Sequence, residues 1–107
     1  MVITENEAGQ HLKFLIETDV EAGRAKALVD SLDEQRKTIE AIEFINAKGS
    51  AAERKQVALS SNGYLEHISK LENARYEFET LRNRRLTAVT AIDMWRSVNS
   101  NQRKGNI

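Results

Sequence analysis

The chain contains no cysteine and no proline, and aromatic residues make up only 6% of its 107 positions. Without cysteine it has no disulfide framework, no thiolate metal site and no thiol nucleophile. The lack of proline permits long uninterrupted helices, whereas the scarcity of aromatic residues argues against a β-sandwich. No apolar run approaches the ~18 residues of a membrane-spanning helix, and the polar N-terminus lacks the parts of a signal peptide. We therefore expect a small cytoplasmic protein without membrane contact.

Apolar residues recur at helical spacing over two long segments, which flank a single strong break at Gly49. Most steps are of three or seven residues, which favours helices over strands. Gly49 suits the left-handed conformation that ends a helix, and Ser50 with Glu53 forms a capping box for the next helix. Another capping box, Thr4 with Glu7, marks the start of the first segment. The pattern predicts an all-α fold.

A turn near residues 48–50 predicts a long antiparallel helical hairpin over residues 1–96, followed by a polar, basic tail at residues 97–107. Such a turn pairs residue i with about residue 97 minus i, which places Leu32 near Leu65. A two-helix hairpin buries only one stripe per helix, so apolar residues outside that stripe need another partner. We therefore expect assembly into a homo-oligomeric helical bundle, in the simplest case a dimer.

A compact monomeric bundle is the competing architecture, because two weaker signals interrupt the helical segments. Ser31 and Glu34 form a third capping box directly after Asp30, and the run from Ser60 to Gly63 consists of weak helix formers. Breaks at these two places would divide the chain into shorter helices that pack on one another. The sequence leaves both architectures open.

The sequence contains no recognisable catalytic or metal site. His11 and His67 fall far apart in the predicted hairpin, and neither has a second histidine at metal-ligand spacing. A glycine-rich phosphate loop, a G-x-S-x-G sequence and a paired-carboxylate motif are all missing. A long hairpin also offers little concave surface for catalysis. We therefore expect a non-enzymatic protein that uses no metal and no cofactor.

The formal net charge is zero, but the charges are unevenly distributed along the chain. Residues 1–46 carry five basic and ten acidic side chains, whereas residues 82–107 carry six basic side chains and one acidic. The basic end predicts a surface for nucleic acid or an acidic partner. Its candidate residues are Arg82, Arg84, Arg85, Trp95, Arg96, Arg103 and Lys104.

A structural explanation competes with this interpretation. The hairpin would bring Arg82, Arg84 and Arg85 alongside the acidic first helix, where they would form weak surface ion pairs. Trp95 would then be a core residue, rather than an anchor for a partner or a stacking platform for a base. The last three basic residues favour the binding interpretation, because they lie at or beyond the end of the first helix.

Three short runs in the second half of the chain carry a resemblance to known proteins: Glu53 to Lys55 after the turn, Tyr76 to Arg85, and Trp95 to Arg103. With these runs, the second half resembles the C-terminal half of small helical proteins encoded by tailed bacteriophages and prophages. The resemblance implies a phage protein that is encoded near replication and recombination genes. It implies no enzymatic activity and no site residues.

Together these features predict a non-enzymatic phage accessory protein that acts by binding in phage DNA metabolism, in replication or recombination. A helical scaffold would present the basic C-terminal end to DNA or to a DNA-processing protein. Two other classes of function stay open. One is an inhibitor that occludes a host defence protein or a host enzyme, and the other is a structural protein of virion assembly.

Overall fold

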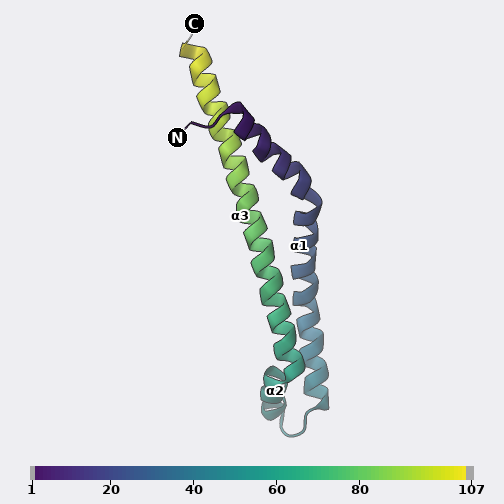
Figure 1. The fold of residues 1–107 in the computed structure, drawn as a ribbon. Helices are drawn as coiled ribbons and strands as arrows, with labels where there is room; N and C mark the ends of the chain where they lie inside the picture. The colour runs from purple at the N-terminus through teal and green to yellow at the C-terminus, as the bar shows by residue number, and fades with distance from the viewer. Residues whose placement is uncertain (1, 106–107) are drawn as a thin grey trace. The chain divides into compact units, whose positions relative to one another are not determined.

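The computed structural model describes residues 2–105 and is 92% helical. Three helices follow one another along the chain (Figure 1): α1 (Glu5–Asn46), α2 (Ala51–Ser60) and α3 (Asn62–Gly105). Residues 2–105 contain no strand, so the predicted all-α fold is confirmed. No helix in this part of the chain is long and apolar enough to cross a membrane.

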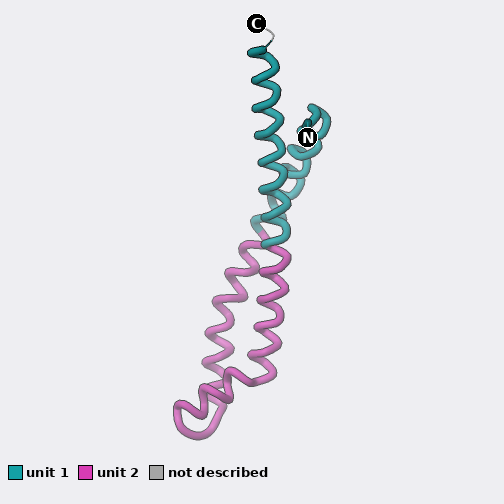
Figure 2. The backbone as a smooth tube through the Cα atoms, turned by 90° about the vertical axis from the view of Figure 1, so that its left-hand side faces the viewer, with its two compact units in different colours: residues 1–23, 79–107 teal, residues 24–78 magenta. Residues whose placement is uncertain are grey.

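The helices contribute to two compact units (Figure 2). Unit 1 comprises residues 1–23 and 79–107, and unit 2 comprises residues 24–78. Each unit therefore contains a segment of α1 and a segment of α3, while α2 belongs to unit 2 alone.

The predicted helix starts are present in the structure. The Glu7 amide donates a hydrogen bond to Thr4 Oγ1 over 3.1 Å, and the Glu53 amide donates to Ser50 Oγ over 3.2 Å. Both hydroxyls also donate to the carboxylate three residues on. Gly49 has a φ of 113°, the conformation that glycine adopts more readily than any other residue. The connection between α1 and α2 thus forms where the glycine and serine predict it.

One of the two weaker break signals is also realised. Helix α1 continues through Asp30 without interruption, whereas the helix breaks at Ser61, next to the predicted position at Gly63. Ser61 serves both ends of the break, since its amide and hydroxyl donate to the Ala58 carbonyl and its Oγ accepts from the Tyr64 amide. Serine suits this place because its side chain replaces backbone hydrogen bonds that the break removes.

The buried faces of α1 and α3 follow steps of three and four residues, the spacing of a coiled-coil seam. On α3 a seam of half-buried and buried positions runs from Tyr64 to Trp95 at 64, 67, 71, 74, 78, 81, 85, 88, 92 and 95, with positions 68, 80 and 91 beside it. On α1 such a seam runs from Ala8 to Glu43 at 8, 11, 15, 18, 22, 25, 29, 32, 36, 39 and 43, with positions 14, 33 and 40 beside it. Many of these positions hold alanine or a polar residue. The segments of α1 and α3 within each unit therefore pack closely but bury little apolar area.

Each unit has its own small core. In unit 1, Ile3, Ala8 and Ala91 form a buried cluster against which Trp95 packs. In unit 2, Leu71 is the largest fully buried side chain, at 2% exposure. The other buried residues of unit 2 are Ala47, Ala58, Tyr64, His67 and Ala74.

The pairing of α1 with α3 in unit 2 differs from the prediction. Leu32 was expected near Leu65, but its carbonyl oxygen lies 2.6 Å from His67 Nε2, and Leu65 is half exposed. The partner of Leu32 on α3 is thus displaced by two residues from the predicted one.

The C-terminal end also differs from the expected frayed tail. Helix α3 continues past Ser97 to Gly105, with Arg103 and Lys104 in its last turn. Cations at the last turn interact favourably with the negative end of the helix dipole, which helps the polar segment to stay helical. Residues 106 and 107 of the predicted tail lie outside the described residues.

Candidate partner-binding surface

All seven candidate residues lie on α3 within unit 1. The structure separates them into residues engaged in packing and residues that face solvent. Arg85 and Trp95 belong to the first group. The others are exposed: Arg82, Arg84, Arg96, Arg103 and Lys104.

Arg85 joins α3 to α1. One guanidinium nitrogen donates to the Leu15 carbonyl over 2.8 Å and to Thr18 Oγ1 over 2.6 Å, and the other donates to Asp19 over 2.8 Å. The side chain is only 21% exposed. Arginine suits this position because its stem packs in the seam while its rigid fork reaches several acceptors. Arg85 is therefore a structural residue of unit 1, as the competing explanation predicts for it.

Trp95 is half-buried against Ile3, Ala8 and Ala91. The N-terminal segment before α1 supplies Ile3, so the indole packs against the start of the chain as well as against the helix. A side chain in this position contributes to the hydrophobic core of unit 1.

Two of the exposed arginines have acidic neighbours on their own helix. Arg82 lies 3.5 Å from Glu79, and Arg96 lies 3.9 Å from Asp93. All four side chains are more than half exposed, so these pairs contribute little and break easily when a stronger anion approaches.

The exposed basic residues are not spread evenly around α3. At 3.6 residues per turn, four of them fall within an arc of about 100°. We call this set the basic stripe: Arg82, Arg96, Arg103 and Lys104. Arg84 lies on the opposite side of the helix. The basic stripe thus collects four exposed cations within one arc of α3. Arg85 falls in the same arc, about five turns before Arg103, but α1 engages it there.

Unit 2 contains a polar cluster that the distribution of basic residues along the sequence does not predict. Asp33 accepts from Arg36 over 3.4 Å and from Arg75 over 3.5 Å, which links α1 to α3. Hydrogen bonding to Tyr64, and then to Asp33, raises the pKa of Arg36 above its usual value. His67 lies in the same seam and must donate to the Leu32 carbonyl, because a carbonyl oxygen only accepts. The spacing of three and four residues in the sequence could have revealed this cluster, because it places position 36 in the seam of α1 and positions 64 and 67 in the seam of α3.

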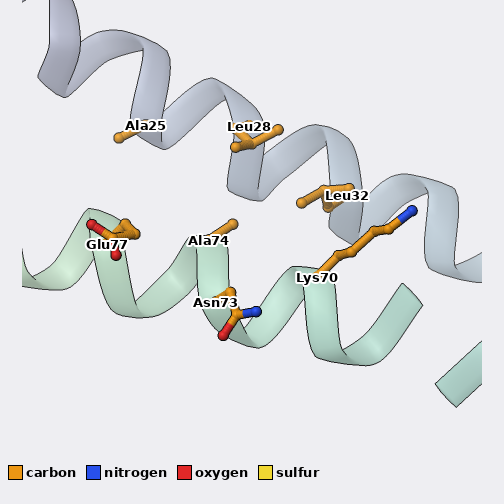
Figure 3. A pocket seen from close by; sticks show the side chains of 7 residues that line it. All are labelled: Ala25, Leu28, Leu32, Lys70, Asn73, Ala74 and Glu77. Atoms are coloured by element: carbon orange, nitrogen blue, oxygen red, sulfur yellow. The ribbon is translucent and has the colours of Figure 1, made fainter. Parts of the chain in front are cut away.

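The shallow groove in Figure 3 lies between α1 and α3 of unit 2 and has a volume of about 450 Å³. Its lining is mostly apolar, and Lys70 reaches across it toward α1 beside Leu32. Glu77 lies at the other end, and the lining includes no serine, threonine or histidine. Within residues 2–105, no group of three or more histidine or acidic side chains is placed to hold a metal ion. The groove suits an apolar contact rather than acid–base chemistry.

No protein-family model matches the chain, and neither curated proteins nor solved structures provide a match.

Proposed function

We propose that the chain is a non-enzymatic phage accessory protein that binds nucleic-acid phosphates through the basic stripe of α3, in the cytoplasm of the host cell. The observation that carries the proposal is the separation of roles on α3. Arg85 and Trp95 are used for packing, while the four side chains of the basic stripe are exposed. The resemblance of the second half to phage proteins supports a role in phage replication or recombination.

The basic stripe consists of four cations and includes no aromatic side chain, which favours contacts to phosphates rather than to bases. Phosphate contacts position a protein on DNA but carry no sequence information. We therefore expect weak binding at physiological salt, with little preference among sequences. A scaffold of this kind would hold DNA near a processing protein rather than select a site.

The test is a titration of fluorescent duplex and single-stranded DNA over a range of salt concentrations. Four phosphate contacts by the basic stripe give a slope of log affinity against log salt of about −3 to −4. Replacing Arg96, Arg103 and Lys104 by alanine removes most of this slope, because only the contact of Arg82 is left. The matched control replaces three exposed lysines of unit 2, Lys37, Lys48 and Lys55, and so removes the same charge elsewhere.

Equal losses in the two triple variants would contradict the proposal, because the binding would then follow net charge rather than the basic stripe. No binding by the unaltered chain at low salt would also overturn it. That result would favour a protein partner, as in the inhibition of a host protein or in virion assembly. Circular dichroism of both variants checks that the helices are intact.

We also propose that the helical segments form the predicted antiparallel hairpin and that copies of the chain assemble into a homo-oligomeric bundle. The seam spacing of α1 and of α3 supports the hairpin. Large apolar side chains left exposed in both units support the assembly, among them Ile16 at 68%, Ile45 at 70% and Tyr76 at 69%. Light scattering at tens of micromolar tests it, and a monomer at that concentration would contradict it.

A further inference from the structure

The outer face of α1 in unit 1 carries an unpartnered apolar row. Leu12, Ile16 and Val20 are 52%, 68% and 67% exposed and lie four residues apart, so they fall on one side of the helix. The buried seam of α1 runs along a different side, through Ala8, Leu15 and neighbouring positions. Nothing in unit 1 covers the row, although it is the most apolar part of the exposed surface of this helix segment.

A glycine lies at each end of the row. Gly9 and Gly23 sit inside α1, where glycine is less favourable than alanine by about 0.5–1 kcal/mol. A Cβ added at either position would meet no atom within 4 Å, and neither residue has a positive φ. The fold of the single chain thus gives no reason for either glycine. Close approach of a second helix would supply one, because glycine lets backbones come near each other.

The five residues have a symmetric order. The row reads Gly9, Leu12, Ile16, Val20, Gly23, with steps of three, four, four and three residues, and it is the same small-large-large-large-small pattern in both directions. We call these five residues the α1 stripe. In an antiparallel pair of identical helices, this order lets large residues face large residues and each glycine face a glycine, so the α1 stripe is complementary to itself.

We propose that two copies of the chain associate through the α1 stripe, antiparallel and about a two-fold axis at Ile16. This inference rests on the self-association proposed above and assigns its surface. The axis pairs residue i of one copy with residue 32 minus i of the other. Leu12 of one copy then lies beside Val20 of the second copy, and Gly9 lies beside Gly23 of the second copy.

The charges beside the α1 stripe fit this arrangement. Lys13, Glu17 and Glu21 flank the stripe on the same side. The two-fold axis brings Lys13 of one copy between Glu17 and Glu21 of the second copy, so opposite charges meet at the rim. Within one chain Lys13 lies 3.8 Å from Glu17, and both side chains are more than 60% exposed, which leaves them free to form the pair between copies.

Disulfide cross-linking tests the surface directly, because the chain has no cysteine of its own. The axes of two packed helices lie about 8–10 Å apart, and each Cα lies about 2.3 Å from its own axis. The Cα atoms of two facing copies of residue 16 therefore come within the range of a disulfide. We expect Ile16→Cys to form a cross-linked dimer rapidly under mild oxidation. Leu12→Cys alone should not, because the two sites would lie about 12 Å apart along the axis, at 1.5 Å per residue. A mixture of Leu12→Cys and Val20→Cys chains should cross-link to each other.

Three outcomes would overturn the proposal. Equal cross-linking of Leu12→Cys and Ile16→Cys with themselves would indicate a parallel pair. A chain that is dimeric by light scattering but does not cross-link at residue 16 would use another surface, and only the assigned surface would be wrong. A monomer would overturn both this inference and the self-association on which it rests.

A charge at the two-fold axis gives an independent measurement. Ile16→Lys places two like charges opposite each other and should weaken self-association about 100-fold or more. The matched control is Ile45→Lys, since Ile45 is equally exposed but lies in unit 2. Both residues face solvent in the single chain, so both variants should keep the helix content of the unaltered chain. Equal weakening by the two variants would contradict the assignment.

Discussion

Arg85 offers the sharpest separation between a structural and a binding residue. Replacing it by alanine removes the hydrogen bonds to the Leu15 carbonyl, Thr18 and Asp19. The resulting loss of stability is smaller than the sum of three charge-assisted hydrogen bonds, because the acceptors are not left buried without a hydrogen-bond donor. The Thr18 hydroxyl still donates to the Phe14 carbonyl over 2.7 Å, and Asp19 is 76% exposed and regains water. We expect the free energy of unfolding to fall by about 1–2 kcal/mol.

Urea unfolding followed by circular dichroism, at one fixed protein concentration, measures this loss. Arg85→Lys keeps the charge but not the planar fork, so it should recover less than half of the lost stability. Arg103→Ala is the control, because this exposed side chain lies in the last turn of α3. It should weaken DNA binding and lower the free energy of unfolding by much less than Arg85→Ala does, because it loses only an exposed interaction with the helix dipole. The reasoning fails if Arg85→Ala leaves stability unchanged and weakens DNA binding as much as Arg103→Ala does.

Three further substitutions test the packing. Leu71→Ala should cost about 2–4 kcal/mol of unfolding free energy, since this side chain is the largest one fully buried, and a loss below 1 kcal/mol would show a loose seam. Trp95→Ala should cost about 2–3 kcal/mol by thermal or urea unfolding, because the ring is half-buried; an unchanged stability with lost single-strand affinity would restore the stacking interpretation. Gly23→Ala should raise the stability of the dilute monomer by about 0.5–1 kcal/mol, and a decrease there would reveal a contact within the chain.

The positions of the long helices and the starts of α1 and α2 could be predicted from the sequence because they depend on local chemistry. The absence of proline, the capping pairs at Thr4 and Ser50, and the turn at Gly49 each act over a few residues. The choice between a break at Asp30 and one at Ser61 was not decidable in this way. Both carry a serine signal, and only the break at Ser61 is realised.

The seam was harder to predict because polar residues occupy part of it. A search for apolar residues alone selects Leu65 and passes over His67, yet Leu65 is half exposed and His67 is 5% exposed. Strict steps of three and four residues from Tyr64 would have led to His67 and to Arg85. Both side chains fit there because each finds a backbone carbonyl on α1 as an acceptor.

The candidate site was predictable in composition but not in the role of each residue. The accumulation of cations after residue 81 is visible in the sequence, and so is the exposed position of Arg96 and Arg103 near the end of the chain. The engagement of Arg85 depends on the register between α1 and α3. The packing of Trp95 depends on Ile3, which precedes the first helix and carries no helical periodicity.

The two proposals are linked by a measurable consequence. A dimer carries two basic stripes, and if both contact one duplex, the slope of log affinity against log salt should be about twice that of a single chain. Ile16→Gln is suited to this test, because it disrupts the α1 stripe without changing the charge of the protein. We expect it to halve the slope while each chain still binds DNA, and Ile45→Gln, equally exposed in unit 2, to leave the slope unchanged. An unchanged slope for Ile16→Gln, in a protein shown to be monomeric, would mean that a single chain makes all the phosphate contacts and that pairing through α1 serves a purpose other than DNA binding.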